Sequence, residues 1–382
     1  MAPIPHARVQ GAGPSGALTA LALAQAGWTV TLTDPQDSDQ LRDRDRAYAL
    51  THSSARLLRD LGLWDSLSPG LIPFRTLELW DRGLRRQVSF SLRDLPAACR
   101  TSGAVGWILQ HRALMAALLK QLAATETIHL DLGQPSTPAA SAEAAADLVV
   151  AAEGGTSATR QQVALPFWQH TYRQACLTAQ VCLRGSADDQ AWELFRPEGP
   201  LAVLPLGGGR FQVVWSASQA TCRTLEALAP SAFLDRLAGV LPDQLQPDAL
   251  EDQPRAFSVA IALAPRLWKG RTVLVGESGH RCHPVGGQGL NLCWRDTALL
   301  ARLAGRAARG DLPLSTLPSA YGRRRRLDLL LTLTATDLLV RLYSNRHPLL
   351  RPVRHLAMTL LQHQPWVRRL SLTAMTLGGA PG

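Results

Sequence analysis

The sequence predicts an α/β fold: a nucleotide-binding domain built from two separated segments, a second domain rich in β-strands, and a helical C-terminal segment. Two glycine-rich turns, one near residue 13 and one near residue 286, each follow a short apolar strand and precede a helix. Alternating apolar and polar residues between them indicate strands at 175–183, 201–206 and 211–216. The implied limits are 1–165 and 258–320 for the nucleotide-binding domain, 166–257 for the strand-rich domain, and 321–382 for the helical region.

Composition places the chain among ordinary globular proteins. Its 382 residues are 46% hydrophobic and 18% charged, which is enough to bury more than one core. No signal-peptide pattern opens the sequence, and no apolar run reaches the ~18 residues of a membrane span. The six cysteines lack CxxC spacing, so neither a zinc site nor a disulfide framework is indicated. We expect a cytoplasmic protein without a bound metal.

The net charge of +10 is concentrated at the C-terminus. From Tyr321 onward there are ten arginines, no lysine and two aspartates, among many leucines. Such a basic and apolar region is suited to peripheral contact with an anionic membrane, here the inner membrane face. The alternative is a solvated arginine face that keeps the protein soluble. No nucleic-acid-binding motif accompanies the charge, so we do not expect a nucleic-acid partner.

The first glycine-rich turn has the spacing Gly11-x-Gly13-x-x-Gly16. It lies between a short strand and an alanine- and leucine-rich helix, and the next strand, 28–33, ends at Asp34. In Rossmann-like folds these glycines permit a tight turn, a close approach to a pyrophosphate and close helix packing, while an acid about 20 residues later binds a ribose. The four residues therefore predict a dinucleotide site. Asp34 has the alternative of being a turn residue before Pro35.

The second glycine-rich turn follows the apolar run 272–275. Gly286, Gly287 and Gly289 permit backbone conformations that other residues avoid, and leucines at helical spacing predict a helix that begins near Leu290. The unpaired N–H groups of a helix start favour an anion, or a ring that becomes anionic when reduced. Reduced flavin is such a ring.

Residues 276–296, GESGHRCHPVGGQGLNLCWRD, resemble the second flavin-contacting motif of the FAD-dependent aromatic-ring monooxygenases, and within them the ubiquinone-biosynthesis hydroxylase family. Glu277 stands where the family has aspartate. The resemblance implies FAD as the cofactor and a set of contacts to it in this stretch: Glu277, Pro284, Gly286, Gly287, Gly289, Leu290 and Asn291.

Four shorter segments extend the resemblance. The RAYAL segment implies that Arg46 approaches the flavin, unless it is a solvated arginine at a helix start. Arg112 opens an R-x-x-L pattern whose arginine faces the cofactor's phosphate or ribityl part. Glu153-Gly154 resembles the family's DG pair between the flavin and the nicotinamide path, again with glutamate for aspartate. The tail motif YGRRRRLD separates the quinone-biosynthesis branch from relatives that act on small soluble phenols.

The resemblance also implies a reaction. NADH or NADPH reduces FAD, O2 adds to give a flavin hydroperoxide, and one oxygen passes to a polyprenylated phenol on the way to ubiquinone or a related quinone. Residues 166–257 then form the substrate-binding sheet, and a quinone-biosynthesis complex is a possible partner. No catalytic base is assigned. The one candidate is His283, which lies in the flavin loop and has a structural role as its alternative.

Three rival functions share parts of this pattern. A flavin-dependent halogenase needs a W-x-W-x-I-P run, which the sequence lacks. A prenyl reductase of the same fold reduces double bonds without oxygen, so oxygen uptake separates it from a hydroxylase. A non-catalytic scaffold in a quinone-biosynthesis complex is favoured by the two glutamates that replace family aspartates.

Overall fold

The computed structural model describes residues 3–378, except 136–137, 139–140, 142–143 and 145, so the outer limits of the predicted domains lie outside it. A six-stranded, mostly parallel sheet forms the nucleotide-binding domain, in the order β16-β17-β9-β1-β2-β8. Its strands are β1 (His6–Gln10), β2 (Thr29–Asp34), β8 (Ile128–Leu132), β9 (Leu148–Ala151), β16 (Trp268–Lys269) and β17 (Thr272–Leu274). Since β17 of the second segment pairs with β9 of the first, the prediction of a discontinuous α/β domain is confirmed.

The helices α1 (Pro14–Gln25) and α6 (His111–Ala123) pack on this sheet, and α11 (Gln288–Ala308) packs against α1. The Oγ1 atoms of Thr19 in α1 and Thr297 in α11 are 2.8 Å apart, and Trp28 Nε1 donates to the carbonyl of Ala304 at 3.0 Å. The helices that follow the two glycine-rich turns therefore lie side by side. Shorter helices are α2 (Ser38–Arg42), α3 (His52–Asp60), α4 (Trp64–Leu67), α5 (Ala97–Arg100) and α8 (Ala158–Gln162).

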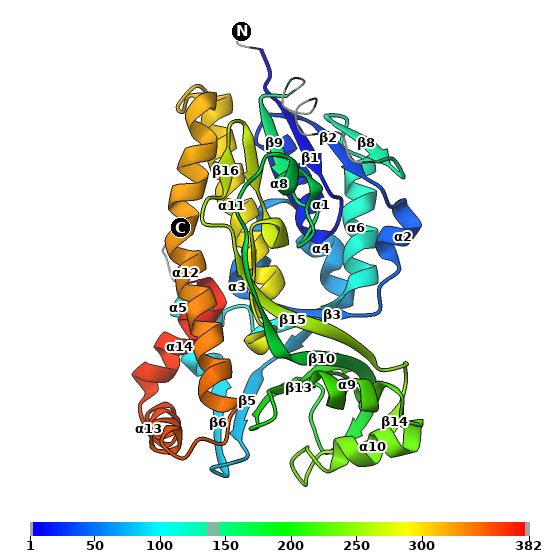
Figure 1. Cartoon of the computed structure of the whole chain (residues 1–382), viewed down its shortest axis with the longest axis vertical. Helices are drawn as coiled ribbons and strands as arrows, with labels where there is room; N and C mark the ends of the chain where they lie inside the picture. The colour runs from blue at the N-terminus through cyan, green and yellow to red at the C-terminus, as the bar shows by residue number, and fades with distance from the viewer. Residues whose placement is uncertain (1–2, 136–137, 139–140, 142–143, 145, 379–382) are drawn as a thin grey trace.

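A larger, mostly antiparallel sheet forms the other end of the molecule (Figure 1). Its strands are β5 (Thr76–Asp81), β6 (Arg86–Ser91), β10 (Trp168–Arg184), β11 (Gln190–Phe195), β12 (Leu201–Gly207), β13 (Arg210–Ser218), β14 (Gln246–Leu250), β15 (Arg255–Leu263) and β18 (His280–Arg281). The strands predicted at 175–183, 201–206 and 211–216 all form, within β10, β12 and β13. One face carries α9 (Gln219–Glu226) and α10 (Pro230–Ala238) over a separate apolar core.

Two strands of this sheet come from the segment predicted for the FAD domain. β5 pairs in parallel with β11, and β6 completes the edge next to β5. The pairing joins residues more than a hundred positions apart in sequence, so local pattern does not reveal it. A small third sheet, β3 (Ala47–Leu50), β7 (Gly106–Gln110) and β4 (Leu71–Phe74), connects the two ends.

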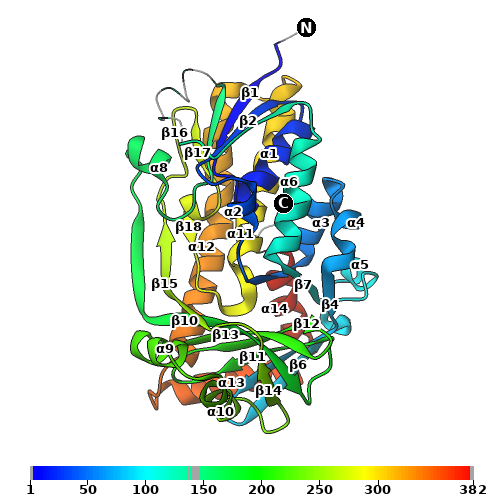
Figure 2. The same cartoon turned by 90° about the vertical axis from the view of Figure 1, so that its right-hand side faces the viewer.

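The C-terminal region is helical, as predicted: α12 (Leu317–Tyr343), α13 (Leu350–His363) and α14 (Pro365–Leu377). The long α12 runs alongside both sheets, and α13 lies near β6 at the end of the larger one (Figures 1 and 2). Tyr321 in α12 donates its hydroxyl hydrogen to the carbonyl of Leu274 at 2.8 Å. Within the described ranges, no helix has the length and apolar character needed to cross a membrane.

Candidate active site

A cavity of about 1440 Å³ lies where the domains meet. Both glycine-rich turns line one side of it, the free face of the larger sheet lines another, and residues of α12 and α14 close a third. Its volume exceeds the ~300–1,000 Å³ of common small-molecule pockets, so it has room for a dinucleotide and a second molecule.

The first turn contains two glycines that the backbone requires and one that leaves space. Gly11 has φ +98°, and a Cβ there would lie 2.5 Å from the carbonyl oxygen of Ala152. A Cβ on Gly16 would lie 1.7 Å from the carbonyl oxygen of Gly11, so α1 can approach the strand only without a side chain. Gly13 differs, because a Cβ added there would have no atom within 4 Å. Gly13 therefore faces open cavity.

Asp34 links the first turn to the end of β2. Its Oδ2 accepts from the backbone N of Ala12 at 2.6 Å, and its Oδ1 accepts from the N of Gln36 at 2.8 Å. The carboxylate lines the cavity while it holds the turn. Since each carboxylate oxygen has two lone pairs, these two bonds leave capacity to bind a ribose hydroxyl.

The second turn also leaves donors free toward the cavity. Gly286 and Gly287 have φ +67° and +62°, and α11 begins at Gln288, two residues before the predicted start. No side chain caps this helix start, and the Cβ position of Gly289 has no atom within 4 Å. Gly286, Gly287, Gly289, Leu290 and Pro284 all line the cavity.

The first turn lies beside Gly276, the start of the second motif, and both glycine-rich turns line the same cavity. A Cβ on Gly276 would be 3.3 Å from Oγ of Ser15, which follows Gly13 and Pro14 in the first turn. Asp296 fixes the start of the second motif, because its Oδ2 accepts from Gly276 N at 2.8 Å and from His280 Nε2 at 2.7 Å. An extended ligand can therefore touch both turns at once.

Comparison with known proteins identifies the family. A model of the FAD binding domain family matches residues 7–100 and 109–328. The ubiquinone hydroxylase UbiL of Rhodospirillum rubrum is 30% identical over 394 residues, covering 98% of this chain and 90% of that protein. The chain belongs to the ubiquinone-biosynthesis hydroxylase family of FAD-dependent aromatic-ring monooxygenases. The 3-demethoxyubiquinol 3-hydroxylase of Escherichia coli is 28% identical and covers 95% of this chain and 96% of its own length.

Solved structures share the monooxygenase fold. The p-nitrophenol 4-monooxygenase PnpA of Pseudomonas putida superimposes with a TM-score of 0.76, covering 99% of both chains at 20% identity. An HpxO variant of Klebsiella pneumoniae, solved with FAD, gives a TM-score of 0.74 and covers 98% of both chains at 17% identity.

The cavity of this monooxygenase fits FAD on its own geometry. Gly13 and Gly289 leave room for close approach, two uncapped helix starts offer N–H donors, and Asp34 offers an acceptor. A pyrophosphate and a flavin ring need these features. We therefore place FAD across the two turns.

A hydrogen-bonded chain holds Arg46 at the cavity. Its Nε donates to the hydroxyl oxygen of Tyr48 at 2.8 Å, Tyr48 pairs with Nδ1 of His111 at 2.8 Å, and His111 Nε2 meets the carbonyl of Leu41 at 2.8 Å. A carbonyl only accepts, so Nε2 carries the hydrogen and Tyr48 donates to Nδ1. Burial lowers the pKa of His111 to about 4, so the ring is neutral. The sequence analysis identified Arg46 but missed Tyr48 and His111.

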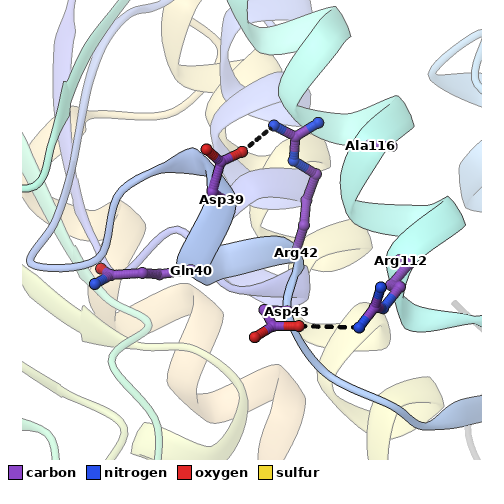
Figure 3. Close-up of a pocket in the computed structure, with 6 residues that line it drawn as sticks. All are labelled: Asp39, Gln40, Arg42, Asp43, Arg112 and Ala116. Atoms are coloured by element: carbon purple, nitrogen blue, oxygen red, sulfur yellow. Dashed lines mark hydrogen bonds and ion pairs between the residues drawn. The ribbon is translucent and has the colours of Figure 1, made fainter.

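Arg112 lies elsewhere. Its Nη2 is 2.9 Å from Oδ1 of Asp43 and 3.2 Å from Oδ1 of Asp45, and its side chain is 61% exposed. It borders a smaller hollow of about 560 Å³ between α2 and α6, beside the Arg42–Asp39 ion pair (Figure 3). Arg112 is not among the residues that line the large cavity, but its partners Asp43 and Asp45 are, so the contact with the cofactor that the resemblance implied stays a prediction.

The two substituted glutamates both reach nearby donors. Glu153 lines the cavity, and its Oε2 accepts from the hydroxyl of Ser157 and from the N of Thr159 at the start of α8. Glu277 also lines the cavity and forms an ion pair with Arg281 at 2.8 Å. Gly154 follows Glu153 with φ +83°, a conformation that favours glycine.

Asn291 supports the turn from behind. Its Oδ1 accepts from the N of Thr51 and the hydroxyl of Ser54, and its Nδ2 donates to the carbonyls of Ala49 and Gly287. The side chain is buried away from the lining residues. These hydrogen bonds make Asn291 a brace between α11, β3 and the second turn, and its contact with the cofactor stays a prediction.

His283, the candidate catalytic residue, is also buried outside the cavity lining. Its Nδ1 accepts from the N of Val285 at 3.1 Å, and its ring packs edge-on against Tyr172 at 5.4 Å. Burial lowers its pKa to about 4. The neutral ring packs inside the protein, and a catalytic role of His283 stays a prediction.

One titratable residue of the cavity escaped the sequence analysis. Glu193 in β11 is only 7% exposed and lines the cavity, and its Oε2 accepts from the backbone N of Gly286 at 3.3 Å. Burial raises its pKa to about 7. Among the residues described, no three His, Cys, Asp or Glu side chains gather as a metal site.

Proposed function

We propose that this monooxygenase hydroxylates a polyprenylated phenol in the biosynthesis of ubiquinone or a related quinone, with NADH or NADPH and O2 as co-substrates. Bound FAD would supply the redox chemistry that links the nicotinamide, O2 and the phenol. The names of the relatives support the substrate class.

The observation that carries the proposal is the apolar wall opposite the flavin turns. The free face of the larger sheet presents a continuous set of hydrophobic side chains to the cavity: Leu77, Leu79, Phe90, Ala191, Phe195, Ala202, Leu204 and Val214. Such a wall binds an aromatic ring and an isoprenoid chain and excludes water. Water exclusion matters because it prevents wasteful loss of the reactive oxygen species.

The C-terminal helices offer a route for a lipid substrate. Leu338 and Leu339 of α12 line the cavity, yet they are 60% and 36% exposed. The exposed apolar surface continues along the helix at Leu331 and Leu327, which recur at helical spacing. Exposed Arg323, Arg324 and Arg326 precede this row. We propose that this row and its arginines rest on an anionic membrane, and that the phenol enters from there.

Vesicle flotation tests the membrane contact. The wild-type protein should float with vesicles that contain phosphatidylglycerol, less so as salt rises, because each basic residue near the surface contributes about 1 kcal/mol. The double variant Leu331→Asp, Leu338→Asp should not float with the vesicles. Ile4→Asp alters an equally exposed apolar residue near the N-terminus and serves as the control. Equal flotation of both variants contradicts the proposed surface.

The reaction is tested with purified protein, FAD, NADH or NADPH, 2-geranylphenol and isotopically labelled O2. We expect phenol-stimulated oxidation of the nicotinamide and a product that carries one labelled oxygen atom. Reduction of the geranyl double bonds without oxygen uptake points instead to a prenyl reductase. A protein that retains no flavin and oxidises no nicotinamide fits the scaffold alternative.

A further inference from the structure

The strand alternation of β11 divides its side chains between two environments. Trp192 and Leu194 pack into the separate core beneath α9 and α10. Ala191, Glu193 and Phe195 point the other way and line the cavity. Glu193 is therefore a carboxyl group placed on the apolar wall rather than at its edge.

The neighbours of Glu193 across the sheet are apolar. It pairs in register with Ala202 of β12 on one side and with Leu79 of β5 on the other. The other polar side chain on this part of the wall, Gln212, is occupied by Ala47, because its Oε1 accepts from the N at 2.7 Å and its Nε2 donates to the carbonyl at 3.3 Å.

Glu193 keeps acceptor capacity for a ligand. Within the part of the chain that the structure describes, its carboxylate makes one hydrogen bond, to Gly286 N at 3.3 Å. A carboxylate has about four lone-pair sites, so most of its capacity is unused. A buried, under-used carboxyl group costs free energy unless a ligand completes its hydrogen bonding.

The same hydrogen bond places Glu193 beside the flavin turn. Gly286 opens the second turn, and α11 begins two residues later. A ring held between the apolar wall and the flavin thus has one carboxylate within reach, next to the place where oxygen is delivered.

We propose that Glu193 receives the hydroxyl group of the phenol substrate and accepts its proton during oxygen transfer. This inference rests on the proposed function. The phenol O–H bond breaks heterolytically, the proton moves to a carboxylate oxygen of Glu193, and the electron pair stays on the phenol oxygen. Delocalisation of that pair makes the ortho and para carbons more nucleophilic.

The attacked ring carbon forms its new C–O bond to one oxygen atom of O2 and then loses its hydrogen as a proton, and the electron pair of that C–H bond restores the aromatic ring. This proton joins the second oxygen atom, which leaves as water, while the proton held by Glu193 returns to the phenol oxygen. Glu193 is thus regenerated, and O2 and the nicotinamide of the proposed reaction are the oxidant and the reductant.

Charged side chains that line the cavity include Arg46, Arg255 of β15 and the Glu277–Arg281 ion pair. Three other buried titratable groups near this wall stay neutral in the working range. They are Cys176 of β10, Cys282 before the second turn, and Tyr343 of α12, whose ring stacks on Phe195 at 4.1 Å. Burial raises the pKa of each to about 12. Because burial brings the pKa of Glu193 to about 7, this group alone among them changes charge near neutral pH, where a general base is most effective.

Three variants test the inference. Glu193→Gln keeps an oxygen that accepts from Gly286 N but removes proton acceptance, and Glu193→Asp keeps the acid on a shorter chain. Glu78→Gln is the matched control, since Glu78 is a buried carboxylate of β5 that accepts from Gln87, Ser89 and Gln190 and does not line the cavity.

The first measurement is binding of 2-geranylphenol to the FAD-loaded protein, followed by perturbation of the flavin spectrum, between about pH 5.5 and about pH 8.5. In the wild type and in Glu78→Gln, Kd should fall about fivefold as pH rises through 7, because a charge-assisted hydrogen bond replaces a neutral one. In Glu193→Gln, Kd should not vary with pH. The second measurement is hydroxylation, which should fall about 100-fold in Glu193→Gln, with partial recovery in Glu193→Asp.

The outcomes separate the two ideas. If Glu193→Gln keeps the wild-type pH dependence of binding and the wild-type rate, the role of Glu193 is overturned. If the wild type binds the phenol with the expected pH dependence but forms no hydroxylated product, the proposed function fails while Glu193 stands as the hydroxyl ligand. A cavity that binds no phenol at any pH overturns both.

Discussion

Nε of Arg325 in α12 lies 2.6 Å from Oδ1 of Asp296 in α11, and the two side chains are 5% and 0% exposed. The other oxygen of Asp296 holds Gly276 and His280 at the start of the second motif. Asp328 completes the cluster by pairing with Arg325 and with Arg295. The arginine-rich tail motif thus buries one of its arginines to fix the flavin-binding end of the molecule.

Arg325→Met should destabilise the fold strongly. It removes the guanidinium that pairs with buried Asp296, and removing one partner of a buried ion pair costs about 3–5 kcal/mol. Arg346→Met is the control, because Arg346 pairs with Glu198 while 81% exposed and should cost less than about 1 kcal/mol. Urea unfolding of both variants measures the difference. Similar losses contradict a special role for the cluster.

Glu193→Gln should change how stability depends on pH. Burial raises the pKa of Glu193 from 4.5 to about 7. The protonated carboxyl group therefore contributes fully to the free energy of unfolding below pH 4.5, the pKa of the unfolded chain, and this contribution is lost as pH rises through 7. The variant lacks this loss. The difference in free energy of unfolding, variant minus wild type, should therefore increase by up to about 3 kcal/mol between pH 5 and pH 9. Each pKa unit corresponds to about 1.36 kcal/mol. A gap that is constant with pH shows that Glu193 ionises at its usual value.

Tyr48→Phe should weaken the support of Arg46. The hydroxyl accepts from Arg46 and donates to buried His111, so its loss leaves Nδ1 of His111 unpaired. An unpaired buried acceptor costs about 1–3 kcal/mol. Thermal unfolding measures this loss, and FAD titration measures the expected drop in affinity as Arg46 becomes free to move. An unchanged melting temperature contradicts the hydrogen-bonded chain.

The two glycines of the first turn should respond differently to alanine. Gly16→Ala brings Cβ within 1.7 Å of the carbonyl oxygen of Gly11, so α1 must move and little folded protein is expected. Gly13→Ala meets no atom within 4 Å and keeps φ near −62°, so the free protein should be as stable as the wild type. Circular dichroism of the two purified variants checks both statements. Loss of structure in Gly13→Ala contradicts the open space at that position.

Local sequence predicts the features that depend on local geometry. Gly11, Gly286 and Gly287 have positive φ angles that the glycine patterns implied, and the predicted strands and the helical tail form. The motif spacing also places Arg46 at the cavity. Arg112 pairs with Asp43 and Asp45 of another segment, which its own motif does not reveal, and its approach to the cofactor stays a prediction.

Features that depend on pairing across the sheet were beyond local reasoning. Glu193 lies in AWELF, which reads as an ordinary strand, and only its partners Ala202 and Leu79 show which face it occupies. The parallel pairing of β5 with β11 is likewise a long-range contact without a local signature. Asn291 is the opposite case. The motif identifies its position from the sequence, but the sequence does not show that its side chain bonds to the backbone carbonyls of Ala49 and Gly287.

The central claim is that FAD lies across the two glycine-rich turns. Titration of the flavin-free protein with FAD, followed by flavin fluorescence and the visible spectrum, tests it most directly in the wild type and in Gly13→Ala. We predict tight binding to the wild type and at least about a tenfold rise in Kd for the folded variant, because its methyl group fills the space that the pyrophosphate needs. Equal affinity of the two proteins, or no binding of FAD to the wild type, would contradict this placement.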